Sequence, residues 1–372
     1  NLSLARAMEK FTKTEKVTSA DGRSATMIST HMFDNQPITK FFILSLMGSN
    51  LLFLQGFALI CMFVYFLPYI VTIPILTLYA LHIFFSGAEH TGSLEIPVYR
   101  RLLFGFAVYE YFNGKMIIED DIRVEPDRPY IFGIHPHAIF GFGQVPFMCS
   151  HPSNPFYARF PSLCGKVHGT GASVVYTIPF VREMFLLAGH ICVARKTLER
   201  FLKKRHSLTI IIGGEAEVMA AQNGKDAVVI EGRKGFVRLA LRYGAGMVPT
   251  YLYHNVDTFY IGTQGPFAGA LKWLQRNFKV SIPITWGLWG SPIPLPAPLV
   301  MVIGKPIEVP QPAVIGGEVD EALVDEYHAK YVAELQSLFE RHKLNAGYDA
   351  SRTLEILPAP EARHKSSKSK AE

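Results

Sequence analysis

The chain has 372 residues, of which 49% are hydrophobic, and its formal net charge is +6. This length is enough for one large or two modest domains with a buried core, and the hydrophobic content is high for a soluble protein. The positive charge suits an anionic membrane surface and not nucleic acid, because no basic-aromatic recognition module accompanies it.

The first 85 residues change abruptly from polar to apolar. Residues 1–40 show no apolar periodicity, which predicts a mobile polar tail. Residues 41–85 contain no Asp, Glu, Lys or Arg, and a helix needs about 20 apolar residues to cross a bilayer. Pro68 and Pro74 interrupt the run, where a helix would break. The sequence therefore predicts a transmembrane helical hairpin over 41–85, with both ends cytosolic because basic residues flank both sides.

Two other interpretations of this apolar run are weaker. A signal peptide would be shorter, would start earlier and would end in a small-residue cleavage site. A pair of helices buried in a protein core would normally keep some polar face, and this run has almost none.

Residues 86–357 alternate short β-branched runs with helical patterns. Strands are predicted at 130–135, 191–195, 208–212, 247–253 and 299–303, and helices at 196–206, 235–243 and 319–343. This alternation predicts an α/β domain with a mixed, largely parallel sheet flanked by helices. Residues 358–372 are basic and of low complexity, which predicts a solvated tail.

Two histidines stand at the end of the first of these strands. They are His135 and His137, separated by Pro136. Strand side chains alternate, so residues two apart face the same way and both imidazoles can point into one site. Proline has no N–H to donate, so the strand is expected to stop there. Paired titratable rings at a strand end predict a catalytic site, although a histidine beside a proline can also simply bond a turn.

A Gly-Gly turn and a carboxylate follow the strand at 208–212. Gly213 and Gly214 allow a positive φ and a close backbone approach, which predicts a place in substrate binding. Glu217 is expected near a helix start, where the helix dipole favours negative charge. It is either a helix-start residue or a site residue, since α/β folds place their sites at such turns.

Three basic residues are candidates for substrate binding. Arg233 and Lys234 precede a predicted helix start, a place suited to anions, although they also fit an ordinary basic helix face. Arg182 is a lone charge in an apolar stretch and needs a partner or a polar ligand.

Missing motifs narrow the chemistry. The sequence has no GxSxG elbow, no Walker loop, no GxGxxG after a strand and no HExxH motif. The histidine pair would bind zinc only with a further ligand such as His168, His190 or His254. No spaced ligand cluster accompanies it, so no metal is expected.

Several blocks in the same order resemble the type-2 diacylglycerol acyltransferases and the related monoacylglycerol and wax-alcohol acyltransferases. The blocks are 130–138 (the YIFGxHPHG signature), 179–189, 212–217, 233–249, 304–307 and 327–343. The chain departs from the family pattern at Asn113, where Pro is usual, and at Asn255, where a carboxylate is usual. It also has Ala138 where most members have Gly, which predicts that this position does not need a positive φ. These departures bear on the acceptor more than on the reaction class.

The resemblance implies a glycerolipid-acyltransferase-like fold and the transfer of a fatty acyl group from acyl-CoA to diacylglycerol, giving triacylglycerol. Monoacylglycerol and fatty alcohol are the alternative acceptors. His135 or His137 would serve as general base toward the acceptor hydroxyl. Glu217 would orient that imidazole.

The resemblance also implies the partners of the protein. Acyl-CoA is a co-substrate, so no cofactor is expected, and its phosphates would meet Arg182, Arg233 and Lys234. The hairpin would hold the domain on the cytosolic face of the endoplasmic reticulum membrane, or on lipid droplets, and a homo-oligomer is left open. From other classes, a metal-dependent lipid hydrolase and a non-catalytic lipid-droplet protein stay as alternatives.

Overall fold

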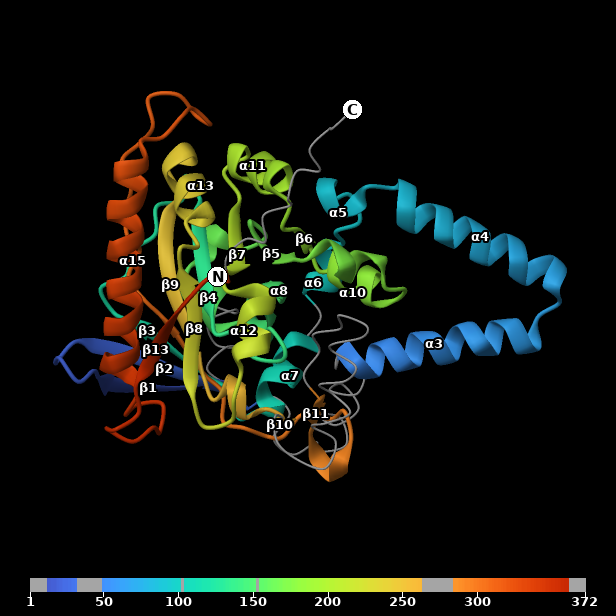
Figure 1. Cartoon of the computed structure of the whole chain (residues 1–372), viewed down its shortest axis with the longest axis horizontal. Coiled ribbons are helices and arrows are strands. Elements are labelled where there is room, and N and C mark those ends of the chain that lie inside the picture. The colour runs from blue at the N-terminus through green and yellow to red at the C-terminus, as the bar shows by residue number, and fades with distance from the viewer. Residues whose placement is uncertain (1–11, 32–48, 102–103, 152–153, 263–283, 361–372) are drawn as a thin grey trace, which may run out of the picture.

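The computed structural model describes residues 12–31, 49–101, 104–151, 154–262 and 284–360. Its centre is a nine-stranded sheet with the order β1-β2-β3-β12-β9-β4-β7-β5-β6 (Figure 1). These strands are β1 Thr12–Thr18, β2 Ser24–Thr30, β3 Lys115–Glu119, β4 Tyr130–His135, β5 Val167–Gly171, β6 Ile191–Cys192, β7 Ser207–Ile211, β9 Gly246–Tyr253 and β12 Val300–Ile303. Five of its eight strand pairings are parallel, so the predicted mixed, largely parallel α/β sheet is confirmed.

Two small ladders and a set of helices complete the described part. β8 Asp226–Glu231 pairs with β13 Leu354–Pro358, and β10 Tyr260–Gly262 pairs with β11 Ile284–Trp286. The helices are α3 Ser49–Phe66, α4 Tyr69–Phe85, α5 Ala88–Thr91, α6 Pro97–Arg100, α7 Phe104–Tyr111, α8 Val145–Met148, α9 Pro155–Arg159, α10 Val181–Leu187, α11 Arg195–Lys203, α12 Gly214–Ala220, α13 Gly235–Tyr243 and α15 Glu321–His342.

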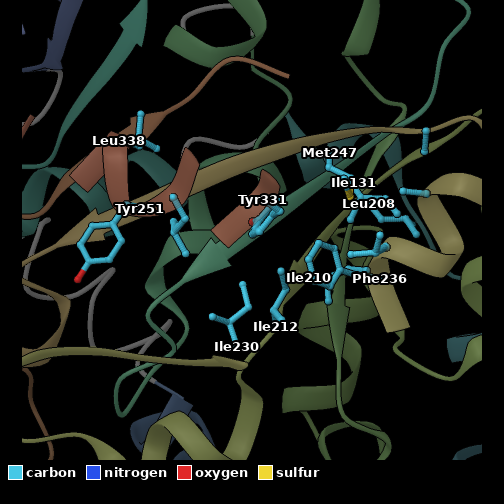
Figure 2. Close-up of a cluster of buried hydrophobic side chains, with 14 of the residues drawn as sticks. Ile131, Leu208, Ile210, Ile212, Ile230, Phe236, Met247, Tyr251, Tyr331 and Leu338 are labelled. Atoms are coloured by element: carbon cyan, nitrogen blue, oxygen red, sulfur yellow. The ribbon is translucent and has the colours of Figure 1, made fainter. Parts of the chain in front are cut away.

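The core lies on both faces of the central strands. Alternate residues of β4 enter different clusters: Ile131 packs with side chains of α13 and α15 (Figure 2), while Phe132 packs with Phe147 and Phe156. Every residue of β4 and β9 is buried. This two-sided burial explains why their sequences are almost continuously apolar and were recognisable as strands.

The N-terminal segment corrects one prediction. Residues 1–40 are expected to be a mobile tail, but β1 and β2 form a hairpin whose second strand pairs with β3. Ala25 and Met27 point into the core, with 0% and 8% of their surface exposed. This two-residue alternation is the strand signal that the polar composition concealed.

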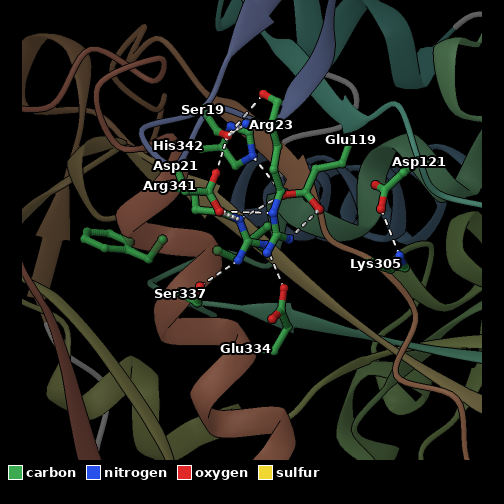
Figure 3. A network of polar contacts seen from close by, with 12 residues as sticks. Ser19, Asp21, Arg23, Glu119, Asp121, Lys305, Glu334, Ser337, Arg341 and His342 are labelled. Atoms are coloured by element: carbon green, nitrogen blue, oxygen red, sulfur yellow. Dashed lines mark hydrogen bonds and ion pairs between the residues drawn. The ribbon is translucent and has the colours of Figure 1, made fainter.

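A polar network that is buried around Glu119 connects the β1–β2 hairpin to α15 and β3 (Figure 3). Glu119 is fully buried and accepts hydrogen bonds from Arg341 Nε at 3.0 Å and His342 Nε2 at 3.2 Å. Arg341 also donates to Glu334 at 2.6 Å, and Arg23 of the hairpin lies 4.0 Å from Glu119. Burial opposes the ionisation of Glu119, but His342 and Arg341 outweigh it and hold its pKa below the usual value.

This network predicts a pH-dependent stability. A carboxyl with a lowered folded pKa stabilises the fold above its unfolded pKa, and that stabilisation is lost as the pH falls through the folded pKa. Glu119→Gln should therefore lower the free energy of unfolding by about 3 kcal/mol near neutral pH, because it removes a carboxylate from Arg341. The difference in free energy of unfolding between this variant and wild type should become smaller below about pH 4. Thermal unfolding across this pH range measures both effects. The exposed Glu326→Gln is the control, and a difference that stays constant with pH would contradict the prediction.

The helices α3 and α4 leave the domain as a hairpin that turns at Leu67 and Pro68 (Figure 1). Of the described residues, one helical stretch, Tyr69–Thr91, is long and apolar enough to cross a membrane, and 11% of its most apolar window is buried. The apolar part of α3 that the structure describes, Gly56–Phe66, is shorter. The helix also continues through Pro74, so of the two expected breaks only the one at Pro68 occurs.

Candidate active site

Glu217 forms the centre of the candidate site. It lies in the first turn of α12 and is 2% exposed. Its Oε1 accepts a hydrogen bond from Val229 N at 3.0 Å and lies 3.4 Å from His135 Nδ1, and its Oε2 accepts from His137 N at 2.6 Å. The structure thus brings together the three residues predicted as catalytic. One histidine meets the carboxylate through its ring, and the other meets it through its backbone.

The Gly-Gly turn is what allows this carboxylate to fold back. A Cβ at Gly213 would lie 2.0 Å from Glu217 Cδ, so any side chain there would displace the carboxylate. Gly214 has a φ of +49°, in the left-handed region that favours glycine. Both glycines shape the approach to Glu217, and their predicted contact with substrate stays a prediction.

His135 is the interior member of the pair, with 0% of its surface exposed. Its Nδ1 faces the Glu217 carboxylate, which can only accept a hydrogen bond while ionised, so Nδ1 carries the proton. Its Nε2 lies 3.4 Å from the hydroxyl of Tyr331 on α15. Burial, and then the charge of Glu217, raise the pKa of Tyr331 well above its usual value. The single proton of the phenol has two acceptors within reach, Gly133 O at 3.2 Å and His135 Nε2, so the hydroxyl lies against the Nε2 side of the ring while Glu217 faces the Nδ1 side.

His137 is the accessible member. Its side chain is half-buried, and its Nδ1 lies 3.0 Å from Ala138 O. A carbonyl only accepts, so this contact places the proton on Nδ1, and no hydrogen bond within the described residues engages the lone pair of Nε2. A neutral imidazole with a free Nε2 is the form that can take a proton from a substrate.

Asn255 is a site residue that the sequence did not reveal as one. It is 1% exposed, and its Nδ2 donates to Pro136 O at 3.1 Å, His137 O at 3.2 Å and Phe140 O at 3.3 Å. These carbonyls belong to the loop that carries His137. β9 runs parallel to β4 with His135 opposite Tyr251, so the chain that follows β9 lies beside the chain that follows β4. The predicted neighbourhood of these two strands is the signal that could have indicated Asn255 as a site residue.

Ala138 contradicts an expectation. Its φ is +49°, although its replacement of glycine predicts that this position does not need a positive φ. An L-residue in the left-handed region costs roughly 1–2 kcal/mol.

Ala138→Gly is therefore expected to be nearly neutral in stability. The strain of a positive φ is relieved by glycine. This gain offsets the roughly 0.8 kcal/mol lost with a buried methyl group and the roughly 0.5–1 kcal/mol that the higher entropy of the unfolded chain costs. The matched control is Ala240→Gly, because Ala240 is equally buried but lies inside α13. That variant should lose roughly 1.5–2 kcal/mol. Thermal unfolding of both variants measures the difference, and equal losses would contradict the explanation.

Arg182 lies elsewhere, at the join between the helical hairpin and the domain. Its side chain is fully buried, its Nη2 donates to Ser86 Oγ at 2.7 Å, and its guanidinium lies 3.0 Å from Glu183 and 3.7 Å from Glu89. Glu183 also accepts a hydrogen bond from Tyr79 of α4 at 2.6 Å. The charge of Arg182 is thus met by the chain itself, which speaks against the predicted contact with coenzyme A phosphates.

Arg233 and Lys234 lie between β8 and α13. Lys234 Nζ is 2.5 Å from Asp325 on α15. Within the described residues Arg233 has no acidic partner, and its buried Nε has no hydrogen-bond partner. Arg233 follows the strand whose Val229 holds Glu217, so it is the better placed of the two to meet an anion near the site.

The three histidines named as further zinc ligands make other contacts. His168 Nε2 lies 2.7 Å from His206 Nδ1, with the two rings stacked, and the pKa of His190 falls to about 3 because it is buried. His254 bonds Ala346 O at 2.9 Å. In the part of the chain that the structure describes, no three His, Cys, Asp or Glu side chains converge as a metal site.

Known proteins are similar to this sequence. The family model described as diacylglycerol acyltransferase matches residues 63–357. Bos taurus diacylglycerol O-acyltransferase 2 is 32% identical over 68% of this chain and 72% of its own length. Homo sapiens 2-acylglycerol O-acyltransferase 3 is 33% identical over 67% of this chain and 74% of its own length, and Homo sapiens acyl-CoA wax alcohol acyltransferase 2 is 28% identical over 67% and 75%. No solved structure matches the chain. The chain therefore belongs to the diacylglycerol acyltransferase family, a family of O-acyltransferases.

Proposed function

We propose that this protein is an acyl-CoA:diacylglycerol O-acyltransferase, which moves a fatty acyl group from acyl-CoA to the free hydroxyl of diacylglycerol and makes triacylglycerol. The observation that carries the proposal is the geometry of His137. Its Nδ1 is engaged by Ala138 O and its backbone N–H is held by Glu217, so a free Nε2 is presented from a fixed loop. Membership of the family supports the reaction class.

The chemistry then needs few groups. Nε2 of His137 takes the proton of the acceptor hydroxyl as its oxygen attacks the thioester carbonyl carbon. The C–S bond breaks, the ester forms, and coenzyme A leaves as a thiol after receiving a proton. A thioester is already activated, so no acyl-enzyme is required. Glu217 holds the loop that carries the base, and His135 contacts Glu217 from the core side, with Tyr331 beyond His135. Arg233 and Lys234 would bind the coenzyme A phosphates.

The apolar stretch that contains α4 supports a membrane location for this chemistry. The stretch Tyr69–Thr91, which begins with α4, is apolar and mostly exposed, and it is long enough to cross a bilayer. We place the domain on the cytosolic face of the endoplasmic reticulum membrane, with lipid droplets as a second location, because diacylglycerol is dissolved in the bilayer.

Monoacylglycerol is the second candidate acceptor, and a fatty alcohol the third. The relative named for 2-acylglycerol is 33% identical to this chain, and the one named for diacylglycerol is 32% identical. Identity therefore does not separate these acceptors.

An acceptor panel tests the proposal. The purified protein is given labelled acyl-CoA with diacylglycerol, monoacylglycerol or a fatty alcohol, in parallel with the His137→Ala variant. Triacylglycerol should form with the highest kcat/KM, in a reaction that survives chelator and is lost in the variant. A higher kcat/KM with another acceptor would reassign the acceptor. Chelator-sensitive release of free fatty acid would favour a hydrolase.

A further inference from the structure

A strongly basic face covers α11 and the turn after it. Six exposed cations lie between residues 195 and 205, and the single acidic residue among them is Glu199. The cations are Arg195, Lys196, Arg200, Lys203, Lys204 and Arg205. The proposed acyl transfer uses none of them.

The other face of α11 is fixed in the fold. Leu198, Phe201 and Leu202 are buried against the domain, so the cations are confined to the outer side of the helix. Glu199 is shared by Arg195 and by Arg242 of α13, at 3.0 Å and 2.9 Å. Among the residues that the structure describes, Glu199 is therefore the only carboxylate that neutralises part of this positive charge.

Five of these cations have no acidic partner within the described residues. Arg200 donates to His90 O and Lys204 lies over the Phe201 ring, so the other three carry the argument. They are Lys196, Lys203 and Arg205, and no ion pair joins any of them to a carboxylate in that part of the chain. Their charge is free to meet a ligand from outside.

This basic face lies next to the point where α4 enters the domain. α5 follows α4, and its His90 Nδ1 lies 2.8 Å from Thr197 Oγ1 of α11, while Arg200 donates to His90 O at 2.9 Å. Gly92 packs so closely on Phe201 that a Cβ there would lie 2.9 Å from the ring. Figure 1 shows α5 between the domain end of α4 and α11. The hairpin turn at Pro68 is at the opposite end of α4.

We propose that the outer face of α11 binds the anionic lipid headgroups of the bilayer that α4 crosses. The inference rests on the proposed membrane position of α4. A bilayer crossed by α4 has its near surface where α4 ends, and clusters of four to eight Lys or Arg beside a membrane helix are attracted to anionic lipids. The cations extend along the whole helix and beyond it, which fits a plane of headgroups better than the phosphates of one bound coenzyme A.

The test uses the full chain in phosphatidylcholine nanodiscs that contain a minor share of photoreactive phosphatidylserine. The variant Lys196→Gln/Lys203→Gln/Arg205→Gln removes three cations of this face. The charge-matched control Lys13→Gln/Arg238→Gln/Lys305→Gln removes three exposed cations elsewhere, which are 70%, 44% and 56% exposed. Wild type and control should be labelled equally, and the α11 variant about tenfold less. Labelling should also fall between about 0.1 M and about 1 M salt, where the Debye length shrinks from about 10 Å to about 3 Å.

Two results would overturn the inference. One is equal labelling of the α11 variant and wild type. The other is a raised KM for acyl-CoA in pure phosphatidylcholine nanodiscs with no change in phosphatidylserine labelling, which would assign the cations to the donor substrate. Alkaline carbonate separates this inference from the proposal on which it rests. Release of the wild-type chain from membranes by carbonate would contradict the proposed membrane position of α4, and therefore also this inference. If the chain stays in the membrane in carbonate but is not labelled, only the proposed binding of headgroups by α11 is contradicted.

Discussion

Replacement of His137 by alanine is expected to lower kcat by roughly 10²–10⁴-fold, the usual contribution of a general base, while the melting temperature hardly changes. The half-buried ring makes one described side-chain hydrogen bond, to the neighbouring Ala138 O, so little packing is lost with it. His137→Gln should be as inactive as His137→Ala, because an amide keeps a donor but has no basic nitrogen. Initial rates with labelled acyl-CoA and thermal unfolding measure the two properties.

His135→Ala provides the contrast. This ring is fully buried between Glu217 and Tyr331, so its loss leaves a cavity and takes one contact from each of them. Glu217 keeps its backbone donors and Tyr331 keeps Gly133 O. We expect a stability loss of about 2–5 kcal/mol, mainly from the cavity, together with a loss of activity. If His137→Ala kept wild-type rates while His135→Ala was inactive but stable, the two roles would be reversed.

The elements that the sequence predicted best are those buried on both faces. β4 and β9 consist almost entirely of apolar residues and were found with errors of at most one residue. β5, with the sequence VHGTG, was missed because its two glycines and its threonine resemble a turn. The predicted strand 191–195 shrinks to Ile191–Cys192, because α11 begins at Arg195.

The site was predictable only where its residues lie near strand ends. His135, His137 and Glu217 each follow or end a recognisable strand, and parallel strands bring such ends together. Tyr331 lies on α15, and its hydroxyl lies beside His135 although 196 positions of sequence separate the two residues. Arg182 needed a partner, as expected, and the structure gives it Glu89 and Glu183, while its contact with substrate stays a prediction. The residues next to Tyr331 and Arg182 in the sequence do not indicate which distant side chains these two residues contact.

Asn255→Asp is the second large effect that we expect. The exchange conserves size but replaces a donor of hydrogen bonds by a carboxylate, which would face three carbonyl oxygens of the loop that carries His137. The loop should move, because such a buried charge without a partner costs several kcal/mol. kcat should fall by about 10²-fold near pH 8, because a small misplacement of the base is costly. The KM for acyl-CoA should change much less.

The pH profile distinguishes positioning from simple damage. A buried carboxyl without a positive partner has a raised pKa, so lowering the pH protonates the introduced group. A protonated carboxyl donates one hydrogen bond, so it restores part of the contact that the Asn255 amide makes with the loop carbonyls. The ratio of variant to wild-type kcat should therefore rise as the pH falls from about 8 to about 6, although both enzymes slow as histidine is protonated. Because both kcat values fall for this reason, the fall cancels in their ratio.

Asn154→Asp is the matched control for this prediction. Asn154 is also fully buried, and its Nδ2 donates to Pro146 O and Cys149 O at 2.6 Å each, away from the carbonyls that Asn255 holds. This exchange should lower the melting temperature and leave the kcat ratio independent of pH. If both variants gave the same flat ratio, Asn255 would only stabilise the fold. If only Asn255→Asp recovers toward acid pH, its amide sets the position of the base, and the carboxylate usual in the family at this position cannot serve here by the same contacts.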